Sequence, residues 1–276
     1  MKRFIFLMIG LAIMLWFPAP SVCETVKLRY HFKPGDQWEC TRMNRMSFMV
    51  MGQKHTKQQR DTILYTVSKG QKKNWVRLSA QFINPPPKTD ENRFSMGQYD
   101  FTYTADVHTS GDTRNIVVSG VENVMQDPSF SPQEKAALIQ SNRIMAESLK
   151  PSIFWFPEMP EDALRSGDEF EDRRTHGLKA SQMASKSQSR QVFVLEDVSE
   201  GLAYFSTKAR HVTKTSTMGG DVKGTSSGKG ETIFDLKEGM WIEVTTKSKM
   251  NFSGAMMGSG EGQEMFMTEK MLMQRR

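Results

Sequence analysis

The chain lacks the residue patterns from which catalytic sites are commonly built. Its five histidines form no HExxH pair, and no phosphate-binding P-loop is present. The two cysteines, Cys23 and Cys40, form no CxxC motif, which excludes a thioredoxin-like redox site and a cysteine-based zinc site. We therefore expect a protein that is not an enzyme, with no catalytic residue, no cofactor and no metal site of these types.

The sequence also lacks a long run of charge of one sign. Its formal net charge is +6, of which Lys2 and Arg3 supply two, and the remaining charges are scattered along the chain. Clustered basic residues are typical of nucleic-acid binding and of electrostatic adhesion to membranes. The sequence therefore favours neither, and no nucleic-acid partner is expected.

A long hydrophobic run occurs once, at the start of the chain. Lys2 and Arg3 precede an unbroken apolar stretch from Phe4 to Phe17, and the small residues of PAPSVC follow. This order is typical of a secretory signal peptide, and the run is shorter than the ~20 residues of a membrane-spanning helix. We predict a signal peptide over residues 1–23 and an exported protein of the periplasm or cell envelope. The alternatives are an uncleaved anchor and a lipoprotein acylated at Cys23, although the residues before Cys23 do not form a lipobox.

The state of Cys40 depends on where the signal peptide is cut. Cleavage after Ser21 leaves Cys23 in the mature chain, where an oxidising compartment would allow a disulfide between Cys23 and Cys40. Cleavage after Cys23 leaves Cys40 as a lone thiol, which we would expect to be buried among apolar residues.

Strand patterns dominate the rest of the chain. In residues 99–107 (YDFTYTADV) and 74–82 (NWVRLSAQF), apolar and polar residues alternate with the period of two that a half-buried strand requires. Short turn signals with glycine recur between such stretches, as in antiparallel hairpins. The stretches at residues 179–189 and 218–230 are polar and rich in small residues, which indicates either long hairpin tips or flexible edges.

One stretch, from Ser131 to Lys150, predicts a helix. Ser131 precedes Pro132, and Glu134 follows three residues after the serine, which together form a capping box with proline in its favoured place. Pro151 is expected to end the helix.

An aromatic connector follows the predicted helix. It contains Phe154, Trp155 and Phe156 in succession, and Pro157 and Pro160 restrict its backbone. Two interpretations remain open at this stage. The aromatic residues either plug the end of a hydrophobic core or form the rim of an apolar ligand site.

Two similar stretches, KPGDQWE at residues 33–39 and RSGDEFE at residues 165–171, indicate an internal repeat. NWVRLSA and GLAYFST, and then TYTADVHTSG and ETIFDLKEG, continue the likeness in the same order, although chance similarity among strands is the alternative. We predict a mainly β fold in which antiparallel sheets form two similar halves, as a clam or incomplete barrel, with one connecting helix. The halves would span residues 24–128 and 165–276, joined by the helix and the aromatic connector at residues 129–164.

Methionine is frequent, with 21 residues, and many of these fall into two clusters. The clusters are RMNRMSFMVMGQ and MNFSGAMMGSGEGQEMFMTEKMLMQ, one in each predicted half. Methionine adapts to irregular cores and to varied apolar ligands, and its thioether suits Cu(I), so a packed core, a ligand site and a copper site are all open. In the pairs Met265/Met267 and Met271/Met273, the spacing places both side chains on one face of a strand.

The order of these motifs resembles that of a family of uncharacterised exported bacterial proteins. The motifs are LRYHFKPGDQWE, a Met-rich hairpin with MGQ, the segment ALRSGDEFE and the hairpin GKGETIFDLKEGM, and the likeness covers most of the chain after the signal peptide. The resemblance implies export and a β-rich fold, and it implies no activity. The predicted architecture is also similar in shape to the half-barrels of periplasmic lipoprotein carriers.

From these patterns we predict an exported, non-catalytic protein that binds a hydrophobic ligand, such as a lipid, or an envelope component. The predicted ligand-binding residues come from the aromatic connector and the two Met clusters: Phe154, Trp155, Phe156, Met49, Met51, Met265 and Met267. Binding would bury the ligand between sheets lined by these side chains. The alternatives are a structural protein that pairs its hairpin edges with an envelope protein, and a Met-rich copper-binding protein.

Overall fold

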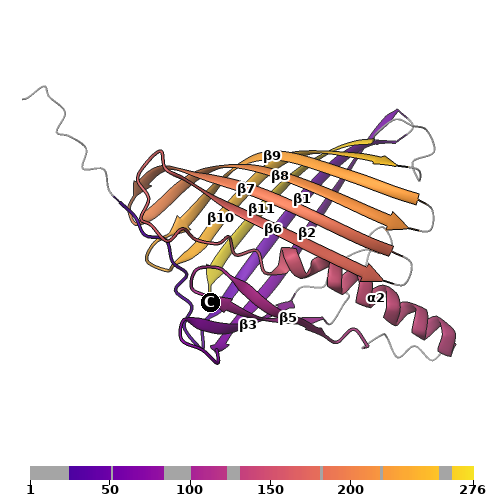
Figure 1. The fold of residues 1–276 in the computed structure, drawn as a ribbon, viewed down its shortest axis with the longest axis horizontal. Coiled ribbons are helices and arrows are strands. Elements are labelled where there is room, and N and C mark those ends of the chain that lie inside the picture. Colours follow the sequence, from indigo (N-terminus) through magenta and orange to yellow (C-terminus); the bar gives the residue numbers. More distant parts are fainter. Residues whose placement is uncertain are drawn as a thin grey trace, which may run out of the picture.

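A computed structural model describes residues 25–50, 52–83, 101–122, 131–180, 183–217, 220–254 and 263–276 (Figure 1). The predicted signal peptide, Cys23 and Met51 lie outside these ranges. Eleven strands and one helix make up the described part. They are β1 (Gln37–Val50), β2 (Gln53–Lys69), β3 (Trp75–Phe82), β4 (Thr102–His108), β5 (Thr113–Ser119), α2 (Pro132–Ile153), β6 (Glu169–Ala180), β7 (Met183–Ser199), β8 (Leu202–Thr217), β9 (Gly220–Asp235), β10 (Met240–Gly254) and β11 (Gln263–Arg275).

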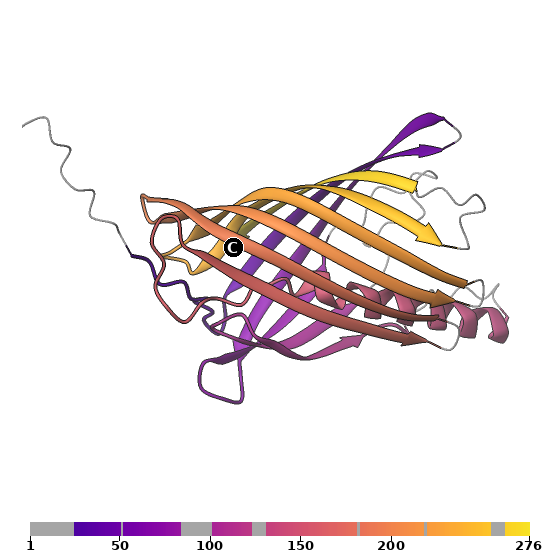
Figure 2. The same ribbon diagram turned by 45° about the horizontal axis from the view of Figure 1, so that its top comes forward.

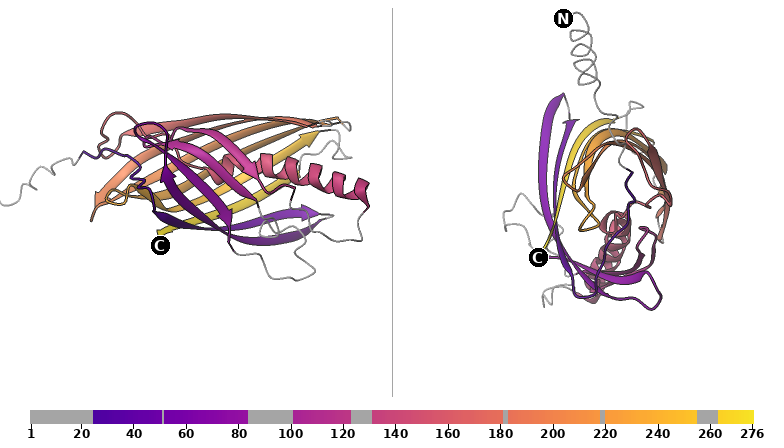
Figure 3. Two further views of the ribbon diagram at one scale, coloured as in Figure 1. Left: turned by 90° about the horizontal axis from the view of Figure 1, so that it is seen from below. Right: turned by 90° about the vertical axis from the view of Figure 1, so that its left-hand side faces the viewer.

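All eleven strands form one antiparallel sheet in the order β5-β4-β3-β2-β1-β11-β10-β9-β8-β7-β6. Strands that follow each other along the chain are neighbours, except that β5 and β6 lie at opposite edges, and the last strand, β11, also pairs with β1. β5 and β6 are the edges, so the sheet is not closed. It curls strongly, and α2 lies within the curve and contacts both edge strands (Figure 2, Figure 3). The predicted mainly β, incomplete barrel with one connecting helix is confirmed, and a single sheet forms it.

The turns before β1 and β6 have the same backbone hydrogen bonds, which explains the repeated sequence. Within the two turns, Asp36 donates to the Lys33 carbonyl as Asp168 does to that of Arg165. Each turn also exchanges two bonds with a neighbouring strand: Gly35 donates to Val67 and Val67 to Asp36, as Gly167 donates to Leu195 and Leu195 to Asp168. A further matched pair lies outside these two turns, where Thr109 donates to Asn74 and Leu236 donates to Gly201. Gly35 and Gly167 both have positive φ, which glycine adopts without strain. The boundaries of the two predicted units stay a prediction.

Residues 183–189 and 220–230 lie in strands at the ends of the β6–β7 and β8–β9 pairs, so they belong to long hairpins, and the alternative of flexible edges is wrong. They belong to β7 and β9, each of which is paired with a strand on both sides. Pairing on both sides outweighs the low strand propensity of serine and glycine. Gly230 shows why a small residue is needed, because a Cβ atom there would lie 2.1 Å from the carbonyl oxygen of Thr245.

α2 begins as predicted and ends later. The Ser131 side chain accepts a hydrogen bond from the Glu134 N–H, and the Glu134 carboxylate accepts one from the Ser131 N–H at 2.7 Å. Pro151 does not end the helix, which continues to Ile153, so the predicted end at Lys150 is wrong. Ile153 is buried in the core, and this burial holds the last turn in place. In the described ranges, no helix combines the length and the apolar character needed to cross a membrane.

The hydrophobic core fills one end of the barrel, which we call the base. The segment at residues 25–32 crosses the base, and its alternate residues Val26, Leu28, Tyr30 and Phe32 are buried. At the other end, which we call the far end, the long strands continue beyond the core, and nearly all of their described residues there are half-buried or exposed. The base is therefore packed solid, while the inner face of the sheet toward the far end is not buried.

Candidate functional site

The register of the strands determines which side chains point into the curve of the sheet. On β1, Trp38, Cys40 and Arg42 point inward because all three are buried, so Asn44, Met46 and Phe48 share their face. Residues directly opposite these on neighbouring strands point the same way. We call this the inner face, and we call the opposite, convex side of the sheet the outer face.

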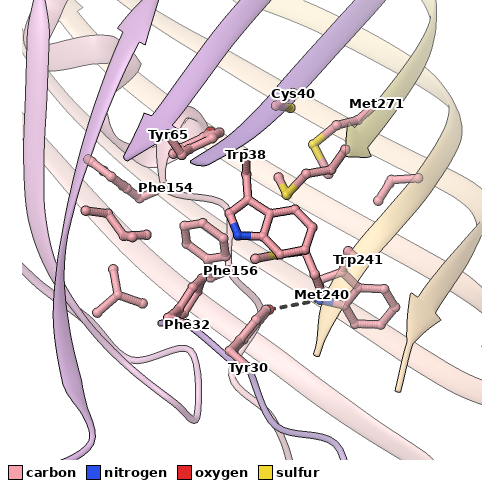
Figure 4. Close-up of a cluster of buried hydrophobic side chains, with 14 of the residues drawn as sticks. Tyr30, Phe32, Trp38, Cys40, Tyr65, Phe154, Phe156, Met240, Trp241 and Met271 are labelled. Carbon is pink, nitrogen blue, oxygen red and sulfur yellow. Dashed lines mark hydrogen bonds between the residues drawn. The ribbon is translucent and has the colours of Figure 1, made fainter. Parts of the chain in front are cut away.

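Two residues of the predicted aromatic connector lie in the core at the base (Figure 4). The side chains of Phe154 and Phe156 are 1% and 2% exposed. Phe156 packs edge to face against Tyr30 and Tyr65, with ring centroids 5.5 and 6.0 Å apart. Trp155 is half-buried and lies against Trp241. The connector therefore plugs the core, and we leave its aromatic residues out of the proposed site.

Side chains from both halves of the sheet hold the connector. Tyr65 donates to the Ile153 carbonyl, and Arg42 donates to the Ser152 carbonyl. From the other half, Arg174 donates to the carbonyls of the aromatic connector and to Asp172, at 2.7 Å to that carboxylate. Burial raises the pKa of the Tyr65 hydroxyl, which therefore stays protonated and remains a donor.

Cys40 is a buried thiol on the inner face of β1. It is 0% exposed, and burial raises the pKa of its thiol, so it has little of the thiolate character that reactivity requires. Its predicted disulfide with Cys23 stays a prediction, because Cys23 lies outside the described residues.

Six apolar side chains form a continuous patch on the inner face of β1, β10 and β11, beyond the core. We call it the Met patch, and it consists of Met46, Phe48, Met250, Phe252, Met265 and Met267. Met46 lies directly opposite Met267, and Met265 lies opposite both Phe48 and Met250. All six residues are half-buried.

The Met patch brings together only two of the predicted binding residues, Met265 and Met267. Met49 directly follows Phe48 on β1, and adjacent residues of a strand point to opposite faces. Met49 therefore points to the outer face, where it is 52% exposed. Met46 and Met250 were in the Met clusters but were not singled out. Their place became visible only through the pairing of β1 and β10 with β11, which lies far away in the sequence.

A polar wall lines the inner face of β6, β7 and β8. Its members are His176, Ser185, Ser187, Ser189, His211, Thr213 and Thr215. The His211 ring nitrogen Nε2 lies 3.1 Å from the Ser187 hydroxyl and 2.7 Å from the Thr213 hydroxyl. Burial lowers the pKa of both His176 and His211, which favours neutral imidazoles. The sequence alone does not reveal this wall, because the serine-rich first part of β7 shows no alternation of apolar and polar residues.

Several buried polar atoms of the inner face have no hydrogen-bond partner in the described part of the chain. They are Arg42 Nε, Asn44 Oδ1, Thr207 Oγ1, Thr232 Oγ1 and Ser248 Oγ. Leaving such an atom without a partner costs about 1–3 kcal/mol, so a polar group bound beside these atoms would be stabilised. The inner face thus combines the apolar Met patch with polar surroundings.

A separate pocket of about 470 Å³ lies on the outer face, and none of the predicted binding residues lines it. It is lined by Glu196, Tyr204, Phe205, Ser206, Glu231, Thr232, Ile233, Glu243 and Thr245. Two of the three carboxylates already have partners, because Ser206 donates to Glu196 and Lys270 lies 2.8 Å from Glu243. The pocket is acidic, and it lies nearer the base than the exposed lysines of β8 and β9.

No protein-family model matches the chain, and no curated protein does either. Among solved structures, the β domain of the Bordetella autotransporter BrkA has a TM-score of 0.39 at 10% identity, covering 87% of this chain and 99% of that one. An exported protein with a YmcC-like fold from Bacteroides fragilis has a TM-score of 0.28 at 10% identity, covering 91% and 100%. An outer membrane channel from Pseudomonas putida has a TM-score of 0.24 at 7% identity, covering 94% and 100%. At TM-scores below 0.5, these likenesses do not bear on function.

Proposed function

We propose that the protein binds an amphiphile with a long hydrocarbon chain on the inner face of its sheet and catalyses no reaction. The Met patch is the observation that carries this proposal, because its six side chains are contiguous, apolar and only half-buried. A hydrocarbon chain lying along them would gain about 0.8 kcal/mol for each CH₂ group removed from water. Methionine is suited to this role because its flexible, polarisable side chain packs against chains of varied shape.

The surroundings of the Met patch favour an amphiphile over a purely apolar ligand. The polar wall offers hydroxyl and imidazole groups on the same inner face. The unpartnered hydroxyls of Thr207 and Ser248 lie on the same face. A ligand with both a polar head group and a hydrocarbon chain would satisfy the two kinds of surface together.

α2 lies inside the curve of the sheet and carries apolar residues beyond the core (Figure 2, Figure 3). Its C-terminal half packs against the core through Met145, Ala146 and Leu149. Leu138 and Ile139, nearer its N-terminus, are half-buried and are not part of that core. The helix runs along the inside of the sheet toward the far end (Figure 3). Its N-terminal half therefore offers two further apolar side chains at the far end of the molecule.

The test is binding of a fluorescent long-chain fatty acid to the mature protein. The variant Met46→Asn with Met267→Asn places amides in the Met patch, and we expect it to bind the probe at least about tenfold more weakly, since each methionine loses much of its apolar contact. The control Met43→Asn with Met49→Asn makes the same two changes on residues that point to the outer face, and it should bind as the native protein does. Equal losses in both variants, or a native protein that does not bind the probe, would contradict the proposal.

The same register also favours a second function, Cu(I) binding. Met46, Met250, Met265 and Met267 bring four thioethers onto neighbouring strands of one face, and soft sulfur ligands suit Cu(I). Titration with Cu(I) under reducing conditions separates the two functions. Binding no tighter than micromolar would remove the copper function, and strong binding lost in the Met46→Asn, Met267→Asn variant would support it.

A further inference from the structure

The register of the sheet gathers on the outer face cations that are scattered in the sequence. Lys208 of β8 lies directly opposite Lys229 of β9, which lies opposite Lys247 of β10. The row continues through Thr268 of β11 to Arg45 of β1. All four cations are exposed. Because each of these cations comes from a different strand, neighbours in this row are far apart in the sequence.

Further rows run beside this one toward the far end. Arg190 lies opposite Arg210, and Lys186 lies opposite Lys214, which lies opposite Lys223. We call the whole surface the basic face. Its exposed cations are Arg45, Lys54, Arg60, Lys186, Arg190, Lys208, Arg210, Lys214, Lys223, Lys229, Lys247 and Lys249.

Few carboxylates neutralise the basic face. Arg190 pairs with Glu171 at 2.7 Å and Lys249 pairs with Glu264 at 2.6 Å, and within the described ranges no ion pair involves its other cations. Like charges directly opposite each other destabilise a pair of strands. These rows therefore lower the stability of the free protein, and an anionic partner would offset that cost.

Exposed apolar side chains lie among these cations. Met49 and Phe266 are two of the four large hydrophobic residues that are exposed in the described part, at 52% and 55%. Both point to the outer face, where Phe266 lies opposite Ser47 of β1 and Met49 lies opposite Lys54 of β2. The Lys249 ammonium lies 5.9 Å from the centre of the Phe266 ring. Cations interspersed with exposed apolar side chains are typical of surfaces that rest in the interface of an anionic membrane.

We propose that the basic face docks on a membrane surface with anionic lipid head groups, with Met49 and Phe266 inserted among them. The face is convex, whereas single-stranded nucleic acids are bound in grooves that follow the backbone. The β1–β2 hairpin, which carries Met49, stands out from the sheet at the far end (Figure 2). The acidic residues around the outer pocket lie toward the base, so the far end of the outer face would approach the lipid.

The test is flotation of the mature protein with lipid vesicles. We expect binding to vesicles of phosphatidylcholine mixed with phosphatidylglycerol, no binding to phosphatidylcholine alone, and release at high salt. The variant Lys208→Gln, Lys229→Gln, Lys247→Gln should reduce partitioning by about a hundredfold. The control Lys69→Gln, Lys72→Gln, Lys73→Gln removes the same charge from exposed residues at the base, and it should bind as the native protein does.

A further variant tests the apolar contacts separately from the charges. Met49→Ser with Phe266→Ser should bind more weakly while keeping the native salt dependence, and its circular dichroism should match that of the native protein. The proposal is overturned if the native protein does not bind anionic vesicles or binds both vesicle types equally. It is also overturned if both lysine variants lose binding to the same extent. Tight binding of a single-stranded oligonucleotide that anionic vesicles do not displace would overturn it in favour of a nucleic-acid partner.

Discussion

The Tyr30 hydroxyl connects three parts of the chain that are distant in sequence. It accepts a hydrogen bond from Trp241 Nε1 at 2.9 Å (Figure 4). It donates one to the Pro157 carbonyl at 3.1 Å. The residue is buried, and burial raises the pKa of its hydroxyl, so it stays protonated and keeps both bonds. It thereby joins the N-terminal segment, β10 and the aromatic connector.

We predict that Tyr30→Phe lowers the free energy of unfolding by about 2 kcal/mol or more, because it leaves a buried donor on Trp241 and a buried acceptor on Pro157. Tyr103→Phe is the matched control. Tyr103 is also fully buried, but its hydroxyl has no partner among the described residues, so its removal should cost nothing or stabilise slightly. Urea unfolding measures both changes. Similar losses in the two variants would show that the hydrogen bonds of Tyr30 do not matter.

At the scale of single elements, the polar wall of β6, β7 and β8 places two imidazoles where burial lowers their pKa. Burial is the main cause for both His176 and His211, and Arg174 and His211 lower the pKa of His176 further. The unfolded chain therefore binds more protons than the folded chain does below the usual histidine pKa of about 6.5. Stability is complete above that pH and falls as the pH drops toward the folded-state pKa.

We predict that His176→Asn with His211→Asn flattens the fall in unfolding free energy between about pH 7 and pH 5, the range in which unperturbed histidines titrate. The control is His31→Asn with His55→Asn, which changes two exposed histidines and should leave the native pH dependence in place. Chemical denaturation at a series of pH values gives both curves. Parallel curves for the native protein and the His176, His211 variant would show that the wall does not couple folding to protons.

The alternation of apolar and polar residues made some strands predictable from the sequence, whereas other strands form because of their pairing with neighbouring strands. β3 was predictable, because Val76, Leu78 and Ala80 alternate with polar residues and are buried as expected. β9 was not, because its first half is rich in glycine and serine and is held as a strand by its pairing with β8 and β10. The same reason limits the prediction of the candidate site. The methionines share a face because of the register between strands that are distant in the sequence, and no single segment of the sequence contains that register.

For the whole molecule, the insertion of β11 between β1 and β10 joins the two sets of strands into one sheet. The two predicted halves are similar in their turns, but they share a core, since Tyr30 of the first half packs against Phe234 of the second, with ring centroids 6.1 Å apart. Similarity of sequence was enough to predict the repeated turns. It did not predict this sharing, because burial between distant segments leaves no local pattern.

We predict that the protein unfolds in a single cooperative step. The pairing of β1 with β11 runs from Trp38 to Phe48, so neither half can open without exposing the other. Unfolding followed by far-ultraviolet circular dichroism and by tryptophan fluorescence should give coincident curves. Hydrogen exchange should give the same opening free energy for the base ends of β3 and β8. Two separate transitions would show that the halves are independent domains.

The edges of the sheet have a consequence for self-association. Among the described strands, β5 and β6 each pair on one side only, and strands with an unpaired side readily join those of another molecule. α2 contacts both of them and separates them from each other. The helix therefore hinders fibre formation and strand exchange. If it moved outward to admit a large ligand, both edge strands would become available for pairing with another molecule.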